Sequence, residues 1–356
     1  VMSNVWGNRI TLSIFGESHG EAIGIVIGGL PAGERIDEDE IAKEMLRRAP
    51  GINEFSTKRK EADKPEIVSG VFDGKTTGAP LCCMIRNTDT RSADYDASLP
   101  RPAHADLTAY FKYKGNNDPR GGGHFSGRLT APLVFAGALA KQILKKQGIA
   151  IGAHIKQIGT VSDTPFTDVS AYLLNEMAKS DFPTLDAAKA DAMKQQILAA
   201  KEQGDSVGGV VECAAFGVPA GLGEPFFGSA ESVISALMYA IPAVKGVSFG
   251  DGFGLSAMHA SEANDPIRLI NGKILTESNH NGGINGGITN GMPIVCSVAF
   301  KPTPSISKAQ QTVNLKTMKN ETLSIKGRHD PCIVPRAVVV TEAMLALAVL
   351  ELWMQR

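Results

Sequence analysis

Glycine is unevenly distributed along this chain, and that distribution limits the folds it can adopt. Glycine accounts for 38 of the 356 residues, about 11% against a usual share of about 7%. The surplus gathers in residues 121–123, 204–209, 217–254 and 279–291. No fixed period relates these stretches, which argues against a solenoid. Since glycine lets a backbone turn sharply and approach a ligand closely, we expect glycine loops that bind ligands on a scaffold of ordinary strands and helices.

The composition indicates a globular protein with a sizeable core. Hydrophobic residues make up 43% of the chain and charged residues 21%, which excludes a mainly disordered protein. The 36 Lys and Arg nearly balance the 37 Asp and Glu, and the formal charge of −1 argues against a dedicated nucleic-acid binder. The uncharged apolar stretch 343–350 is far shorter than the roughly 20 residues that cross a bilayer. We therefore predict neither a nucleic-acid partner nor a membrane span.

The N-terminus and the cysteines both favour a cytoplasmic protein. The first residues lack the cationic lead and the long apolar region of a signal peptide. The cysteines are odd in number and form no CxxC pair, so we expect reduced packing residues and no zinc site: Cys82, Cys83, Cys213, Cys296 and Cys332.

Short β-rich runs alternate with segments that carry helix start and stop signals. The predicted strands are residues 10–15, 24–30, 66–72, 81–86, 207–216 and 292–300. The predicted helices are residues 37–50, 132–148, 186–203, 229–241 and 336–356. No linker-like tract separates these elements, so we expect an α+β fold in a single interwoven domain over residues 1–356.

Two stretches contain few predicted elements, near residues 87–127 and 303–332. Both are too long to be simple connections, so we expect functional loops there. Along the chain, four loops gather ionisable side chains, at residues 16–20, 101–106, 120–128 and 327–330, and all but 101–106 also contain glycine. These loops contain His19, His104, His124 and His329.

Two glycine-rich segments suit anionic or planar ligands. RGGGHFSGR at 120–128 matches neither common nucleotide-binding motif, but its amides, with Arg120 and Arg128, suit an anion in front of a helix that begins near Thr130. The same glycines also suit tight turns. Residues 279–291, which precede Lys301, suit a phosphate or a planar ring, or else a β-bulge or barrel corner. Both interpretations stay open for each segment.

The chain contains seven distinctive motifs between residues 16 and 332, in this order: GESHG, RPAHAD, RGGGHFSGR, GLGEPFF with IPAVKGV, NGGINGGITNGMPI, KPTPSI and GRHDPC. Each is weak alone, but together they resemble the chorismate synthase family over nearly the whole chain. The resemblance implies a β-α-β sandwich fold and a homotetramer. It also implies a lyase that converts 5-enolpyruvylshikimate 3-phosphate to chorismate plus phosphate by anti-1,4-elimination, at the end of the shikimate pathway to aromatic amino acids. Reduced FMN would take part without net redox change.

The resemblance implies catalytic roles for five residues. His19, in GESHG, would lie near the departing phosphate, and His104, in RPAHAD, would lie near the reduced flavin. Asp330 would act with the flavin N5 in removing the C6 proton. Ser18 and Ser126 would assist the flavin.

The resemblance also implies where the cofactor and substrate bind. The implied FMN-binding residues are His124, Phe125, Ser126, Pro242, Ala243, Gly286, Lys301, Pro302, Thr303, Pro304, Ser305 and Arg328. The substrate carries two carboxylates and a phosphate, so several cations must converge in a protein of net charge −1. We expect the substrate to be bound by Arg48, Arg128, Arg328 and His19, with Arg120 and Arg336 as second-rank candidates.

This chain departs from the family pattern in two places. Many members have RGGGRSSAR where this chain has His124 and Phe125, which lowers the local number of donors. Glu54 stands where relatives commonly have arginine, in a basic entry loop that bifunctional members use for NADPH. We see no flavin-reductase domain, and we therefore expect a monofunctional enzyme supplied with reduced FMN by a separate flavin reductase, with NADPH only as a possible reductant.

Two other functions stay open at this point. A non-catalytic flavin- or phosphoanion-binding protein would bind its ligand without turnover, so an activity assay separates it from the lyase. A metallohydrolase would use His19, His104, His329 and Asp330 and would be abolished by chelators. Because no short paired spacing such as HExxH is present, we predict no metal site.

Overall fold

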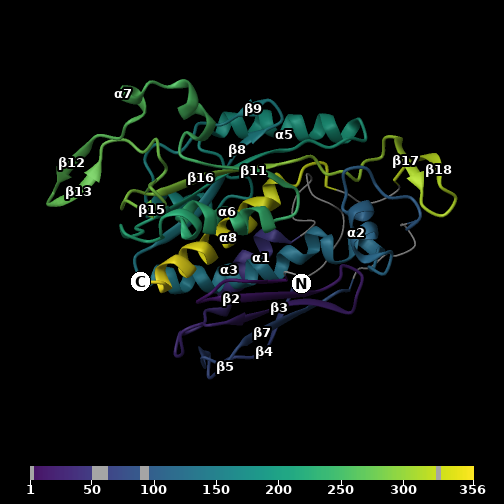
Figure 1. The fold of residues 1–356 in the computed structure, drawn as a ribbon, viewed down its shortest axis with the longest axis horizontal. Coiled ribbons are helices and arrows are strands. Elements are labelled where there is room, and N and C mark those ends of the chain that lie inside the picture. Colours follow the sequence, from purple (N-terminus) through teal and green to yellow (C-terminus); the bar gives the residue numbers. More distant parts are fainter. Residues whose placement is uncertain (1–3, 50–62, 89–95, 326–329) are drawn as a thin grey trace.

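Two antiparallel five-stranded sheets enclose a layer of helices (Figure 1). The computed structural model describes residues 4–49, 63–88, 96–325 and 330–356. The first sheet consists, in spatial order, of β1 (Val5–Trp6), β2 (Thr11–Gly16), β3 (Ala22–Gly28), β7 (Leu81–Arg86) and β4 (Pro65–Ser69). The second sheet consists of β11 (Val244–Phe249), β16 (Ile294–Phe300), β10 (Gly209–Phe216), β8 (Ala150–Ile158) and β9 (Val161–Ser162). The predicted α+β fold with β-α-β layering is confirmed.

Four helices lie between the sheets or at the edges of that layer: α1 (Glu38–Arg48), α3 (Thr130–Lys145), α6 (Ala230–Ala240) and α8 (Val334–Met354). α8 packs against α3, α6, β8 and β10, and α3 also packs against β3. Side-chain caps start two of the helices where the sequence predicts them. Asp37 accepts hydrogen bonds from the N–H groups of Asp39 and Glu40, and Ser229 caps α6.

The central helix α8 is buried along most of its length because α1, α3, α6 and the second sheet surround it. At Gly137 on α3 a Cβ atom would lie 2.2 Å from the Cβ of Ala343, so the two helices cross with their backbones in close contact. Among the described residues, α8 is the one helix long and apolar enough to cross a membrane. However, 89% of its most apolar window is buried inside the protein, which is typical of a core helix.

In the first sheet, buried hydrophobic side chains recur at every second residue. On β3, Ile23, Ile25 and Ile27 are buried, and on β7 Leu81 and Ile85 are buried, all facing the helices. The predicted strand 66–72 is interrupted at Gly70, whose φ is +84°, and continues as the short strand β5 (Val71–Phe72) paired with β6 (Lys75–Thr76).

The smaller elements lie outside this core. The helices are α2 (Asp106–Tyr113), α4 (Ala171–Met177), α5 (Ala187–Glu202) and α7 (Ala260–Ala263), with 3₁₀ turns η2 (Arg120–Phe125), η3 (Gly127–Leu129), η4 (Phe226–Gly228) and η5 (Gly252–Ala257). Three hairpins are β12–β13 (Ile267–Ile270 with Lys273–Thr276), β14–β15 (Ile284–Asn285 with Ile288–Thr289) and β17–β18 (Gln310–Asn314 with Lys319–Leu323).

The two stretches predicted to be functional loops contain secondary structure that the sequence analysis did not predict. Residues 87–127 include α2 and η2, and residues 303–332 include the hairpin β17–β18. α2 follows Ala105, which offers no side-chain cap, and the hairpin strands QQTVN and KNETL contain almost no hydrophobic residues. Neither the capping signal nor the hydrophobic pattern was therefore present.

A buried charge cluster joins three of the helices. Glu342 on α8 is fully buried and accepts two hydrogen bonds of 2.7 Å from the Arg47 guanidinium on α1, and another from Lys141 on α3. Burial by itself would raise the pKa of the Glu342 carboxyl, but Arg47 and Lys141 outweigh burial and lower it from 4.5 to about 2. The carboxylate therefore holds α1 and α3 against α8.

We expect Glu342→Gln to lower the free energy of unfolding by about 3 kcal/mol, the lower end of the range for breaking a buried pair, because Arg47 and Lys141 lose their fully buried partner and keep only Glu44. Urea denaturation measures the loss, and Glu40→Gln, in the exposed pair with Lys43, is the control with an expected cost below about 1 kcal/mol. Since the folded pKa lies below the unfolded one, the Glu342 contribution is complete above pH 4.5 and declines toward pH 2. Equal stability of the two variants would contradict the account.

Candidate active site

Two predicted catalytic histidines lie on either side of the glycine loop 121–123. A Cβ atom on Gly121 would lie 2.4 Å from His19 Nε2, and one on Gly122 would lie 3.1 Å from His104 Cε1. All three glycines have positive φ, at 60°, 87° and 55°. The loop between β2 and β3 is attached directly to it, since the N–H of Ser18 donates to the carbonyl of Gly123 at 3.0 Å. The backbone of the loop thus takes the space that side chains would fill.

His104 belongs to a cluster of charged side chains at the start of α2. Asp106 lies 2.7 Å from His104 Nδ1 and pairs with the Arg101 guanidinium through bonds of 2.7 and 2.8 Å. Burial opposes ionisation of Asp106, yet hydrogen bonds from Arg101 and His104 outweigh it and lower the pKa of this carboxyl below the usual 3.8. Arg101 also donates to Ser305 Oγ at 3.2 Å, which joins this cluster to the predicted cofactor segment.

The predicted cofactor residues 301–305 lie beside three other chain segments. The N–H of Lys301 donates to the carbonyl of Ala243 at 3.0 Å, and Lys301 Nζ donates to the carbonyl of Ala103 in the His104 loop. Ser206 Oγ donates to the carbonyl of Thr303 at 2.6 Å. The neighbouring Val207 donates its N–H to the carbonyl of residue 331, next to Asp330.

The contacts continue from Asp330 to the predicted substrate arginines. Arg336 Nη1 donates to Asp330 at 2.6 Å, and Arg336 Nε donates to the carbonyl of Arg48 at 2.9 Å. The guanidinium groups of Arg48 and Arg128 both donate to the carboxylate of Asp63, one to each oxygen.

Asn87 and Ser126 close the ring of contacts. Arg128 Nε donates to Asn87 Oδ1 at 3.1 Å, and Asn87 Nδ2 donates to the carbonyls of Glu17 and Gly20 at 3.0 and 2.9 Å. Ser126 accepts from the N–H of Arg128 at 3.2 Å, and its own N–H donates to Gly123. We call this set of contacts the loop ring. It runs from the β2–β3 loop through residues 101–106, 301–305 and 330–336 and back to residues 123–128.

Burial and charge pairing have opposite effects on Arg48 and Asp63. Arg48 and Arg128 are 3% and 4% exposed. Burial lowers the pKa of Arg48 from 12.5 to about 10, against the opposing effect of Asp63. Burial raises the pKa of Asp63, but the two arginines outweigh it and keep that pKa below 3.8. In this structure both guanidinium groups are bound to Asp63, so their predicted role toward the substrate stays a prediction.

Two buried hydroxyls in the loop ring are left for a ligand. Ser18 Oγ and Thr303 Oγ1 are buried and have no hydrogen-bond partner among the described residues. Buried polar atoms are rarely left unpaired, so a bound ligand with polar groups would supply the missing partners. The loop 121–123 presents backbone without side chains to such a ligand. These observations suit a flavin at this site.

Several predicted site residues do not join the loop ring. Gly286 lies in the turn of β14–β15, at the opposite end of the molecule from α2 (Figure 1). Arg120 is half exposed and pairs with Asp118 through bonds of 2.9 and 2.7 Å. Arg328, His329 and Glu54 lie outside the described residues.

The two positions that depart from the family pattern lie at the edge of the glycine loop. His124 Nδ1 is 2.7 Å from the carbonyl of Gly16, which ties the loop to the end of β2. Phe125 is 36% exposed and packs near Tyr113 of α2, with 6.2 Å between ring centres. The His124 imidazole therefore has a partner within the protein.

The sequence analysis missed four residues of the loop ring: Asp63, Asn87, Arg101 and Asp106. The last two stand in the RPAHAD motif, where their charges beside His104 were a usable signal. Asp63 and Asn87 carry no local pattern, because their partners are distant in sequence. Among the described residues, no three His, Cys, Asp or Glu side chains lie close enough to hold a metal ion.

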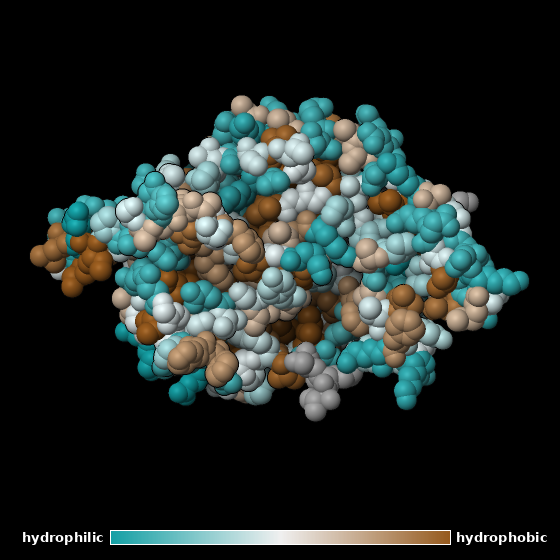
Figure 2. All heavy atoms as spheres, turned by 45° about the horizontal axis from the view of Figure 1, so that its top comes forward, coloured by the Kyte–Doolittle hydropathy of each residue, from teal (hydrophilic) through white to brown (hydrophobic). Residues whose placement is uncertain are grey.

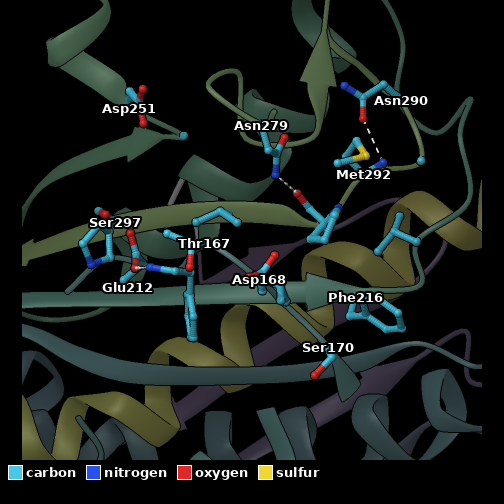
Figure 3. Close-up of a pocket in the computed structure, with 18 of the residues that line it drawn as sticks. Thr167, Asp168, Ser170, Glu212, Phe216, Asp251, Asn279, Asn290, Met292 and Ser297 are labelled. Atoms are coloured by element: carbon cyan, nitrogen blue, oxygen red, sulfur yellow. Dashed lines mark hydrogen bonds between the residues drawn. The ribbon is translucent and has the colours of Figure 1, made fainter. Parts of the chain in front are cut away.

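A large cavity of about 1160 Å³ lies elsewhere, on the face of the second sheet that points away from α8 (Figure 3). Glu212 and Ser297 line its floor, and Thr167, Asn279 and Met292 line its walls. None of the described lining residues was predicted to act in catalysis or cofactor binding. The cavity is therefore separate from the loop ring.

Comparison with known proteins gives a consistent result. A family model described as chorismate synthase matches residues 10–354. The chain is 47% identical over 353 residues to the chorismate synthase of Thermococcus kodakarensis, covering 98% of this chain and 97% of that protein. It is 47% identical over 350 residues to that of Korarchaeum cryptofilum, covering 98% and 96%. A solved structure titled "Crystal Structure of Chorismate Synthase" superposes with a TM-score of 0.76 at 31% identity, covering 98% of this chain and 93% of that one.

We expect Gly121→Ala to displace the His19 imidazole by about 1 Å, because the new Cβ lies 2.4 Å from Nε2 and ordinary contacts begin at 3.4 Å. ¹⁵N-histidine NMR of the purified protein measures the change at the His19 ring. Gly127→Ala is the control, since a Cβ there meets no atom within 4 Å. Identical His19 signals in Gly121→Ala and the unchanged protein would show that the glycine loop does not position this histidine.

Proposed function

The chain belongs to the chorismate synthase family, and from that premise we propose that the loop ring is its active site. The enzyme is a carbon–oxygen lyase (EC 4.2.3.5) that converts 5-enolpyruvylshikimate 3-phosphate to chorismate and phosphate, the last step of the shikimate pathway to aromatic amino acids. The reaction is an anti-1,4-elimination, and the family requires a reduced flavin although no net oxidation occurs. One observation supports the placement most strongly: His19, His104 and Asp330, far apart in sequence, belong to one connected set of loops.

We propose FMN as the flavin. Bound reduced FMN would supply an electron-rich ring beside the substrate. The unpaired hydroxyls of Ser18 and Thr303 and the glycine backbone support its place in the loop ring. The residues that would hold it are His124, Phe125, Ser126, Pro242, Ala243, Lys301, Pro302, Thr303, Pro304, Ser305 and Arg328.

His19 is proposed to act on the leaving phosphate. Its Nε2 lies at the glycine loop, beside the backbone of Gly121. An imidazole there can donate a proton to a phosphate oxygen or neutralise the departing dianion. Ser18 and Ser126 flank this position and would hold the cofactor by their hydroxyls.

Asp330 is proposed to receive the proton from C6. A bond of 2.6 Å from Arg336 orients its carboxylate, which is 10% exposed. An oriented, poorly hydrated carboxylate is well placed to act as a base. His104 is proposed to hold a proton at a ring nitrogen next to the flavin.

Local charge favours a polyanionic substrate in a protein whose net charge is −1. Among the described residues of the loop ring, the cations outnumber the carboxylates by two: Arg48, Arg101, Arg128, Arg336 and Lys301 against Asp63, Asp106 and Asp330. We propose that the substrate anions bind Arg48, Arg128, Arg328 and His19. Access to the first two requires the substrate to share them with Asp63 or to replace it.

We propose that the protein assembles as a homotetramer. Gly286 lies in the turn of β14–β15, which forms none of the contacts of the loop ring, so its proposed cofactor role would be met by a neighbouring copy. The projecting hairpin β12–β13 exposes Ile267, Leu269 and Ile274 at 69–75%, visible as apolar side chains at one end of Figure 2. Light scattering of the purified protein tests this, and a mass near 37.6 kDa would contradict it.

A separate reductase, with NADPH as its reductant, is the proposed source of reduced FMN in the cytoplasm.

We expect the purified protein, given substrate and reduced FMN without oxygen, to form chorismate and phosphate. His104→Ala and Asp330→Ala are each expected to lower the rate by at least about 100-fold, the lower limit of typical acid–base contributions, while retaining the far-UV spectrum of the folded protein. Unchanged rates in both variants would remove the assigned roles. Binding of reduced FMN without any chorismate would instead favour a non-catalytic flavin-binding protein.

A further inference from the structure

Asp106, the first residue of α2, joins His104 and Arg101 in one compact cluster. Its Oδ1 lies 2.7 Å from His104 Nδ1 and accepts a hydrogen bond of 2.8 Å from Arg101 Nη2. Its Oδ2 accepts bonds from Arg101 Nε at 2.7 Å and from the Arg101 backbone N–H at 3.0 Å. The Arg101 and Asp106 side chains are 8% and 21% exposed, so water competes little for these bonds. The carboxylate is thus fixed in orientation by Arg101.

The neighbours of His104 Nδ1 determine which ring nitrogen carries the proton. One neighbour is Asp106 Oδ1 at 2.7 Å, which can only accept a hydrogen bond. The other is Arg101 Nη2 at 3.2 Å, which can only donate and already donates to Asp106. The shorter contact joins the ring to the carboxylate, so Nδ1 must be the donor. The neutral ring then carries its hydrogen on Nδ1 and a lone pair on Nε2.

The opposite edge of the same ring faces the glycine loop. A Cβ atom on Gly122 would lie 3.1 Å from His104 Cε1 and 3.3 Å from Nε2. Because residue 122 is glycine, with φ of +87°, its side chain does not cover that edge. Nδ1 therefore faces Asp106, and Nε2 lies on the side of the glycine loop, where the ligand is proposed to bind.

We propose that Asp106 is a positioning residue that holds His104 with its proton on Nδ1, so that Nε2 is the nitrogen presented to the flavin. This proposal rests on the proposed role of His104. A proton is taken up or released only at Nε2, and no electron is transferred. Asp106 remains a carboxylate throughout and stabilises the ring when both nitrogens are protonated.

Asp106→Asn tests the proposal because Arg101 determines how the amide lies. The position of Oδ2 receives two donors from Arg101 and that of Oδ1 only one, so the amide oxygen is expected at Oδ2, with Arg101 Nη2 displaced from the NH₂ at Oδ1. The amide NH₂ then occupies the position of Oδ1 and donates to His104 Nδ1. We expect the tautomer of His104 to invert, which places the hydrogen on Nε2 and removes the acceptor from the ligand side.

The experiment combines ¹⁵N-histidine NMR of the flavin-free protein with steady-state kinetics. In the unchanged protein at high pH, Nδ1 of His104 is expected to give the signal of a protonated nitrogen and Nε2 that of an unprotonated one. In Asp106→Asn the two signals exchange, and kcat falls about 10- to 100-fold, with KM changed much less. Asp251→Asn is the matched control. The Asp251 carboxylate lies 2.5 Å from His280 Nδ1, so this is also an aspartate–histidine pair, but it lies outside the loop ring. It is expected to change only the His280 signals.

Two results would overturn the proposal. The first is an Nε2-protonated His104 in the unchanged protein, a measurement that needs no variant to fold. The second is Asp106→Asn with the Nδ1 proton and kcat both retained. Full activity of His104→Ala would instead reject the proposed role of His104, while the NMR result at Asp106 would still stand.

Discussion

The close approach of two imidazoles to a backbone without side chains is the constraint on which the site depends. A Cβ at Gly121 would overlap His19 and one at Gly122 would contact His104 tightly, and the positive φ values of both glycines are unfavourable for other residues. The glycine loop also receives the β2–β3 loop through Ser18. The positions of both histidines thus depend on the absence of side chains at residues 121 and 122.

Shared carboxylates keep the buried cations of this protein in place. Asp63 binds two arginines, and Asp106 holds one arginine and one histidine. Glu342 binds Arg47 and Lys141 in the helical layer. Each buried charge among these is compensated locally, which is why a chain of net charge −1 can concentrate positive charge at one site. Stability and anion binding therefore rest on the same kind of contact.

Much of the fold could be predicted because its signals are local. Caps such as Asp37 and Ser229 marked helix starts, and the alternating isoleucines of β3 marked a half-buried strand. β8 was missed because His154, fully buried between Asp163 and Glu212, breaks its apolar pattern. The histidines predicted for the site stood in the motifs GESHG and RPAHAD, and the structure places both against the glycine loop. Asp63 and Asn87 were not, since only the folded chain brings them to Arg128.

A crystal structure with FMN and substrate bound is the most direct test of the central claim that these loops form one site. The account predicts the flavin ring against residues 121–123, with His19 and His104 on either side and the hydroxyls of Ser18 and Thr303 hydrogen-bonded to the ligand. A flavin bound instead in the cavity on the outer face of the second sheet, with the loop ring unchanged and both hydroxyls unpaired, would contradict it.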